Sequence, residues 1–352
     1  MFVFDKDVLI KHKLMEYDKQ SLKTFASDLG LSKLSQLNKS QLADLISEKL
    51  TDPEVMFYRM SILDDAMLGF FEKVLDGPCF FTEDDIEYAA ILNELEVAVL
   101  SKHEIVIPKD IVATWKQVDT PEFHQYRKKA SWVWKCVNWA EEMYGITPIE
   151  IMLQVINAKS GMDMTGLEFD EMFFNFPVDQ TFSLNFSSHI VGMEYLSNKE
   201  KLDYIKRMQA DKEYYIPTVA EVEELYEEMA LISSKAYKDM HKFLIREASM
   251  DPEEAKYLLC DLWRALSIEA DWHGVMQEFA DNIVFDSEDA IRKFAPLYMA
   301  LSNDTRMLIN RGHKPSELHK SGKPDLDKKI KIFPNAPCPC GSGKKYKKCC
   351  GK

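Results

Sequence analysis

The sequence predicts a mainly α-helical, multi-domain protein with short β-hairpins and a helical bundle. At 352 residues the chain exceeds what one core usually holds, so several units are expected. It contains only 13 glycines and is rich in residues that favour helices. Its 46% hydrophobic residues are enough to fill buried cores. Helix-start and helix-stop signals recur along most of the chain.

The composition favours a cytoplasmic protein. No apolar run approaches the roughly 18 residues that cross a bilayer, so no membrane span is expected. The start, MFVFDKDVLIKHK, mixes acids with bases and does not resemble a signal peptide. Cys79, Cys136 and Cys260 are scattered, which is typical of small core residues in a reducing compartment.

The net charge of −14 hides a strong asymmetry. Residues 311–352 contain twelve Lys or Arg and three acids, a balance of +9. Residues 1–310 therefore contain 32 basic and 55 acidic residues, a balance of −23. An acidic body repels phosphate backbones, so any nucleic-acid contact requires a local basic patch, either in the tail or near the N-terminus.

Residues 18–50 have the pattern of two helices joined by an extended loop. The first helix is expected to end at Gly30, and Asn38 begins the second with Gln41 as its capping-box partner. Leucines in the loop are expected to turn inward. The apolar positions are Leu22, Phe25, Ala26, Leu29, Leu31, Leu34, Leu37, Leu42, Leu45, Ile46 and Leu50.

This pattern resembles the SAP-like and Rho-N-terminal family of small nucleic-acid-associated modules, which we assign to residues 1–52. The resemblance implies phosphate contacts, for which Lys23, Lys33 and Lys39 are the candidates. Residues 1–50 contain eight lysines and seven acids, a weak basic balance. The alternative to a nucleic-acid module is a protein-docking module or a purely structural helical cap.

Residues 53–118 look like a winged-helix unit. A helix is expected over 62–76, Thr82 and Asp85 start a second helix, and residues 97–100 and 105–108 form a hairpin. A DNA-binding version would place the helix before the hairpin against phosphates. Here that helix is acidic, which favours a protein-contact or structural role. The acids are Glu83, Asp84, Asp85, Glu87 and Glu94.

A second helical, winged-helix-like unit is expected over 119–197. A helix over 122–144 ends at Gly145, Thr147-Pro148 opens the next helix, and a short helix over 168–174 precedes an extended stretch, 182–192. Helical spacing scatters Trp132, Trp134 and Trp139 around the first of these helices. A core role is therefore expected for the tryptophans, rather than a base-stacking platform.

Residues 198–312 are predicted to form a helical bundle. One long helix is expected over 219–248. Helix starts are expected at Thr218 with Glu221, Asp251-Pro252 with Glu254, and Asp286 with Asp289. His241 and His273 are the titratable candidates for catalysis, but no metal-binding helix, nucleophile elbow or phosphate loop accompanies them. We therefore expect structural histidines, no enzyme and no small-molecule substrate.

A basic linker, 313–334, leads to a tail, 335–352, with the thiol pattern C-x-C-x8-C-C. Four thiolates at about 2.3 Å complete a tetrahedral zinc site, which would be structural, although iron remains open. So short a segment cannot fold on its own apolar surface, so the metal would supply the ordering free energy. The alternatives are a flexible basic tail or redox-active vicinal thiols. The predicted ligands are Cys338, Cys340, Cys349 and Cys350.

The stretch PCPCGSGKKYKKCCG closely resembles the SEC-C motif, the zinc-binding tail first seen on the translocation motor SecA. The resemblance implies a bacterial protein whose small zinc hairpin contacts a chaperone such as SecB, or the ribosome. Lysines beside Tyr346 would form the partner surface: Lys344, Lys345, Lys347 and Lys348.

The resulting hypothesis is a non-enzymatic adaptor, whose acidic helical body binds one protein while the zinc tail binds another protein or ribosomal RNA. The alternative is a nucleic-acid-binding regulator, using the N-terminal module and the tail together. An enzyme hidden in the helical half is the third possibility.

Overall fold

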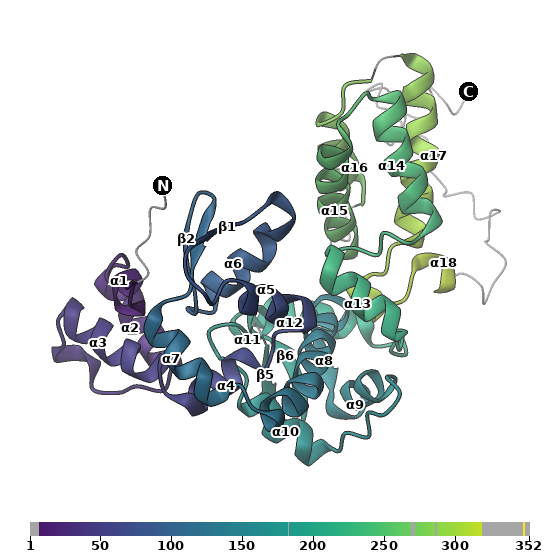
Figure 1. Ribbon diagram of the computed structural model, residues 1–352. Helices are drawn as coiled ribbons and strands as arrows, with labels where there is room; N and C mark the ends of the chain where they lie inside the picture. The colour runs from purple at the N-terminus through teal and green to yellow at the C-terminus, as the bar shows by residue number, and fades with distance from the viewer. Residues whose placement is uncertain (1–6, 182, 269–271, 286, 319–347, 349–352) are drawn as a thin grey trace.

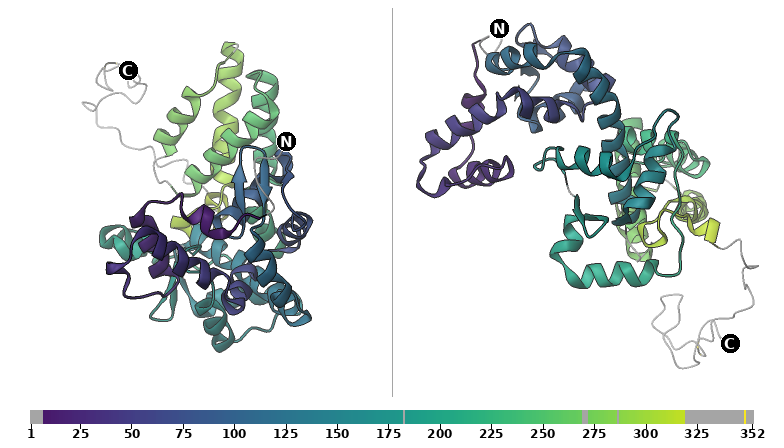
Figure 2. Two further views of the ribbon diagram at one scale, coloured as in Figure 1. Left: turned by 60° about the vertical axis from the view of Figure 1, so that its left-hand side comes forward. Right: turned by 90° about the horizontal axis from the view of Figure 1, so that it is seen from below.

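The computed structural model describes residues 7–181, 183–268, 272–285, 287–318 and Lys348. It is mainly helical, with two small antiparallel sheets (Figure 1). Helices α14 to α17 lie side by side and project from the rest of the molecule, while the N-terminal helices lie at the opposite end (Figures 1 and 2). Within the described residues, no helix combines the length and apolarity that a bilayer crossing requires.

The N-terminal helices follow the predicted capping signals. Asp18 accepts hydrogen bonds from the backbone of Gln20 and Ser21, and Asn38 and Gln41 form a reciprocal capping box at 3.0 and 2.9 Å. Gly30 has a φ of 75°, as a helix stop requires. The loop leucines are half-buried against the core. The elements are α1 (Ile10–Leu14), α2 (Lys19–Asp28), η1 (Leu34–Gln36) and α3 (Lys39–Leu50).

The first sheet unit contains the predicted hairpin and one strand more. Strand β3 lies between β1 and β2, so the sheet order is β1-β3-β2. Thr82 and Asp85 start the helical segment as expected, with a 3.2 Å bond from the Thr82 backbone to the Asp85 carboxylate. The elements are α4 (Pro53–Met60), α5 (Asp65–Lys73), β1 (Cys79–Phe80), η2 (Glu83–Asp85), α6 (Ile86–Glu94), β2 (Val99–Ser101), β3 (Glu104–Val106) and α7 (Lys109–Val118).

The second sheet unit repeats this strand order as β4-β6-β5. One expectation is wrong: Thr147 does not cap a helix but pairs with Ile190 in β4, because the chain stays extended through Pro148. Gly145, with a φ of 67°, ends α8 as predicted. The elements are α8 (Pro121–Tyr144), β4 (Ile146–Pro148), α9 (Ile149–Asn157), α10 (Gly166–Phe174), β5 (Ser183–Phe186) and β6 (His189–Gly192).

The remaining helices include a break that the sequence pattern did not predict. The expected long helix over 219–248 is two helices, because Met229 adopts a left-handed φ of 55° and Ser234 caps a new helix. Ser287 caps α17 by accepting from Ala290 N at 3.1 Å; the predicted cap, Asp286, lies outside the described residues. The elements are α11 (Met193–Ser197), α12 (Lys199–Gln209), α13 (Val219–Glu228), α14 (Lys235–Glu247), α15 (Pro252–Ile268), α16 (Trp272–Asp281), α17 (Glu288–Asp304), η3 (Leu308–Asn310) and α18 (Pro315–Leu318).

Helix α8 runs through the core. Trp132, Trp134 and Trp139 are all buried, which confirms their predicted core role. Most buried apolar side chains, from Ile10 to Leu301, belong to one contiguous cluster. One buried cluster therefore includes side chains from most of the described elements.

Residues 313–318, the first part of the predicted linker, contact the body and include α18. Lys314 Nζ lies 2.7 Å from Asp304 Oδ1, and Glu317 Oε2 lies 3.3 Å from Arg306 Nη1. These contacts hold the last described segment before Lys348, which ends at Leu318, against the body. Except for Lys348, the predicted zinc hairpin lies outside the described residues.

Candidate functional site

The predicted metal ligands and their basic neighbours lie outside the described residues, with one exception. Lys348 is exposed. The donor set itself fits a structural zinc ion, since four thiols within thirteen residues can complete a tetrahedral shell. The residues concerned are Cys338, Cys340, Cys349, Cys350, Lys344, Lys345, Tyr346 and Lys347.

The predicted phosphate-contacting lysines are on the surface of the N-terminal helices. Lys33 is exposed in the loop, with a left-handed φ of 61°, whereas Lys23 on α2 and Lys39 on α3 are half-exposed. Among the described ion pairs, none involves these three ammonium groups.

The two candidate catalytic histidines lie on different helices, His241 on α14 and His273 on α16. His241 Nε2 lies 3.3 Å from the carbonyl oxygen of Pro252, at the start of α15. His273 is exposed on α16. Neither residue lines the hollows described below.

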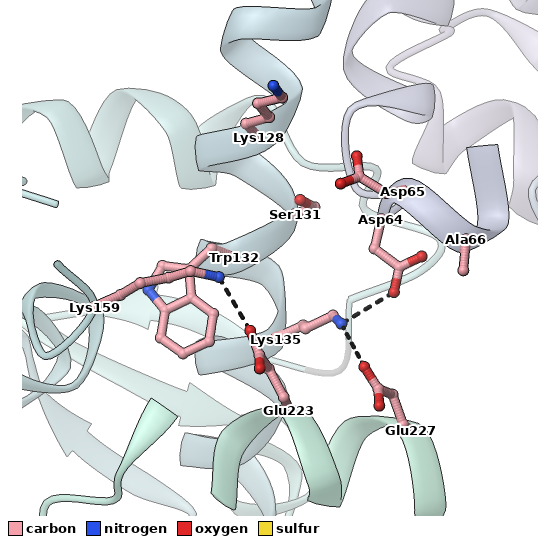
Figure 3. Close-up of a pocket in the computed structure, with 10 residues that line it drawn as sticks. All are labelled: Asp64, Asp65, Ala66, Lys128, Ser131, Trp132, Lys135, Lys159, Glu223 and Glu227. Atoms are coloured by element: carbon pink, nitrogen blue, oxygen red, sulfur yellow. Dashed lines mark hydrogen bonds and ion pairs between the residues drawn. The ribbon is translucent and has the colours of Figure 1, made fainter. Parts of the chain in front are cut away.

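The structure instead contains a charged cleft that the sequence did not predict. It consists of two hollows, one on each side of α13. Its first hollow, about 480 Å³, lies between the start of α5, helix α8 and helix α13 (Figure 3). Its lining residues are mostly charged and come from segments far apart in the sequence. They are Asp64, Asp65, Ala66, Lys128, Ser131, Trp132, Lys135, Lys159, Glu223 and Glu227.

Lys135 joins the three helices around this hollow. Its Nζ lies 3.0 Å from Asp64 Oδ2 and 3.3 Å from Glu227 Oε1 (Figure 3). The same atom lies 4.9 Å from the centre of the Tyr226 ring. Lys135 is only 7% exposed, so its charge is held by these partners rather than by water. Asp64 also caps α5 by accepting from Met67 N at 3.0 Å. One carboxylate therefore serves both a helix start and the buried ammonium group.

A second lysine, Lys159, also lines the first hollow. Lys159 Nζ lies 3.1 Å from Glu223 Oε1 and 4.3 Å from the centre of the Trp132 ring (Figure 3). This geometry combines an ion pair with a cation–π contact. The charges of the hollow are thus largely paired with one another, which favours a structural joint over a ligand site.

The second hollow, about 540 Å³, lies on the other side of α13, towards α6 and α15. It shares Asp64, Ala66 and Glu227 with the first hollow. Its lining combines acidic groups with tyrosines and apolar side chains, and Lys256 is its only lining cation among the described residues. The other residues that line it are Met67, Glu87, Tyr88, Ile91, Tyr226, Glu228, Met229, Tyr257 and Cys260.

The Cys260 thiol, which lines this hollow, is buried. Burial raises the pKa of the Cys260 thiol, and its Sγ lies 3.4 Å from Tyr237 Oη. Burial likewise raises the pKa of the Cys79 and Cys136 thiols. Cys136 and Cys260 are buried, as was predicted for core residues, and Cys79 is half-buried against the core.

The sequence carried one signal for this site. Lys135 interrupts the apolar, tryptophan-rich run WVWKCVNWA on α8, and a lysine on a buried face requires an acidic partner. The partners could not be identified, because Glu227 lies 92 positions away.

Comparison with known proteins identifies only the end of the chain. Residues 335–352 match the SEC-C motif family. The chain is 35% identical over 79 residues to the protein translocase subunit SecA of Thermodesulfovibrio yellowstonii, covering 22% of this chain and 8% of that protein. It is 70% identical over 30 residues to SecA of Syntrophobacter fumaroxidans, covering 8% and 4%.

It is also 86% identical over 21 residues to the uncharacterized protein YccF of Bacillus subtilis, covering 6% of each chain. The chain thus spans less than a tenth of the length of these relatives. No solved structure matches it.

Proposed function

Because residues 335–352 carry a SEC-C motif, we propose that this chain is a cytoplasmic bacterial adaptor without enzymatic activity. In this proposal Cys338, Cys340, Cys349 and Cys350 hold one structural zinc ion. The resulting knob docks on a chaperone-like protein or on the ribosome, while the acidic body binds a second protein.

The observation that carries this proposal is the separation of charge along the chain. Residues 311–352 carry a net charge of +9 and residues 1–310 a net charge of −23, so the two parts suit partners of opposite charge. Lysines around Tyr346 provide donors for acidic side chains or for phosphate. Four thiolates on a divalent ion carry −2, which the same lysines offset.

The two sheet units fit a protein-contact role. We interpret both as winged-helix-like, because each places a hairpin after a helix and has its last strand in the middle of the sheet. Glu87 and Glu94 on α6 are exposed, which disfavours the insertion of that helix into a DNA groove.

The alternative function is a nucleic-acid-binding regulator. The observation that favours it is the surface position of Lys23, Lys33 and Lys39 on the SAP-like N-terminal segment. Phosphate neutralisation would give a steep loss of affinity with rising salt.

The test uses three chains: the intact protein, the Cys349→Ser/Cys350→Ser double variant, and Cys79→Ser as a control outside the motif. Elemental analysis should give one zinc per chain for the first and third proteins, and none for the double variant. Iron in place of zinc would correct the metal. No bound metal in the reduced, intact protein would overturn the site.

The same three chains then capture partners from nuclease-treated lysate. Protein partners that survive nuclease and disappear only with the double variant support the adaptor. Loss of all partners on nuclease treatment supports the regulator instead.

A further inference from the structure

We propose that the second hollow, between α6, α13 and α15, is a docking site for the chain's own basic tail. The occupant is the lysine-rich segment around Tyr346. This inference goes beyond the proposed function, since it concerns how the tail is held when no partner is bound.

The charges of the two parts are complementary. Four carboxylates and one ammonium group, that of Lys256, line the hollow, so its net charge is −3. The carboxylates belong to Asp64, Glu87, Glu227 and Glu228. Lys135, beside the hollow, is held between Asp64 and Glu227 and reduces this to −2. Residues 319–352 contain ten lysines and two aspartates, a balance of +8. With four thiolates on zinc, the tail still carries +6.

The acids differ in how much of their charge is available. Glu228 pairs with Lys256 at 3.0 Å. Glu227 keeps 59% of its side chain exposed beside Lys135. Glu87 is exposed on α6 and has no ion pair or hydrogen bond among the described residues. Glu87 and Glu227 therefore offer free carboxylate oxygens on two walls of the hollow.

The hollow also presents ring and thioether surface. Tyr257 is 57% exposed and Met229 is 44% exposed, although both line a concave region. Aromatic faces and lysine stems pack well together, and an ammonium group over a tyrosine ring gains cation–π attraction. A segment with the sequence KKYKK matches both the charge and the aromatic character of this lining.

The segment that leads to the tail starts from the same part of the body as the hollow. Glu317 in α18 contacts Arg306, and Arg306 Nη2 lies 2.7 Å from Glu221 Oε1 near the start of α13. From Glu221 to Glu228, which lines the hollow, α13 rises about 10 Å. The 28 residues that follow Leu318, up to and including Tyr346, can span roughly 90 Å when fully extended. The segment can therefore reach the hollow of its own chain.

Docking in this hollow would compete with binding of a partner to the tail, because the same lysines would be engaged. A partner would have to bind the tail more favourably than the hollow does. The tail would therefore be free for binding only where the partner is abundant.

The test places a photo-activated benzoylphenylalanine at position 257 of the full-length, zinc-loaded chain. Mass spectrometry then identifies the joined peptides. We expect cross-links from position 257 to peptides of residues 335–352. The same probe at position 174, where Phe174 is 85% exposed on α10, should give none to the tail.

Charge variants make the test specific. Glu87→Lys should lower the cross-link yield roughly threefold to tenfold, since it adds repulsion in the hollow. Glu94→Lys makes the same charge change on the same helix outside the lining and should leave the yield unchanged. In 1 M salt, where the screening length is about 3 Å, the yield from the unaltered chain should also fall.

Mixing isotope-labelled and unlabelled chains shows which copy supplies the tail. Cross-linked peptide pairs in which both peptides carry the same isotope support docking within one chain. A predominance of pairs with one labelled and one unlabelled peptide would overturn the proposal in favour of docking between copies. The proposal also fails if position 257 captures no tail peptide or if Glu87→Lys leaves the yield unchanged. Neither result would affect the zinc and partner assays above.

Discussion

Arg59 and Asp179 face one another through two parallel hydrogen bonds. Arg59 Nη1 lies 2.6 Å from Asp179 Oδ1, and Arg59 Nη2 lies 2.8 Å from Asp179 Oδ2. The same guanidinium donates to the carbonyl oxygen of Leu95 through Nε at 3.2 Å and Nη2 at 2.9 Å. Because the two acceptors come from different sheet units, this one side chain fixes the units against each other.

Arg59→Lys should therefore destabilise the whole fold. Lysine keeps the charge but cannot form the bidentate pair, and Arg59 is only 3% exposed. We expect a loss of about 2–4 kcal/mol in the free energy of unfolding, measured by urea denaturation. Arg292→Lys, at a side chain that is 78% exposed, is the matched control and should change stability by less than about 0.5 kcal/mol. Equal effects of the two substitutions would contradict this assignment.

Glu141 should make stability fall as pH rises towards 7. Burial raises the pKa of the Glu141 carboxyl to about 7, although the Ser183 hydroxyl donates to it at 3.2 Å. The folded pKa thus lies above the unfolded one, so the folded state binds a proton that the unfolded state releases between about pH 4.5 and 7. The cost of the ionised, buried carboxylate is absent below this window and complete above it.

Glu141→Gln removes this titration while keeping an oxygen for Ser183. At pH 8 the variant should be more stable than the unaltered chain by on the order of 2 kcal/mol, and at pH 4.5 the difference should vanish. Thermal unfolding at the two pH values checks this. Glu150→Gln, at an exposed glutamate on α9, is the matched control and should change stability by less than about 0.5 kcal/mol. A constant difference for Glu141→Gln across pH would argue against a raised pKa.

Arg306 should prove essential for holding α18 against the body, since it contacts both Glu317 and Glu221. Its guanidinium lies 3.4 Å from the centre of the Tyr215 ring, and its Nε and Nη2 lie 2.9 and 2.7 Å from Glu221 Oε1. Arg306→Met would leave Glu221 without its cation, at a cost of about 3–5 kcal/mol. Proteolysis should also cut after Lys314 more quickly. Glu317→Gln removes only the weaker, partly exposed partner and should cost less than about 1 kcal/mol.

Local signals explain which parts of the fold could be predicted. The capping boxes at Asn38–Gln41 and Thr218–Glu221 lie within one turn of the chain, and both form as expected. The left-handed turn at Met229 could not be predicted, because methionine is a good helix former and its neighbours continue the apolar pattern. The end of α13 at this position therefore depends on tertiary packing and not on a local sequence signal.

The candidate cleft depends on long-range pairing, which a single sequence does not encode visibly. Lys135 was recognisable as an unusual residue on a buried face, but neither Asp64 nor Glu227 could be assigned to it. Arg59 and Asp179 are separated by 120 positions and carry no shared motif. The tail is the opposite case, because its four thiols lie so close in sequence that their spacing alone supports the proposal of a zinc site.

Removal of zinc should affect the tail and leave the body folded. The described residues 7–318 bury a contiguous apolar cluster of their own, whereas residues 335–352 are too few to bury a comparable surface. A strong chelator should therefore shift the main thermal transition by no more than about 1 °C. Limited proteolysis should meanwhile begin to cut between Cys340 and Cys349, where the intact protein resists. The Cys349→Ser/Cys350→Ser variant, without metal from the start, should be cut equally fast with and without chelator. A fall of about 5 °C or more in the main transition would mean that the metal stabilises the body as well.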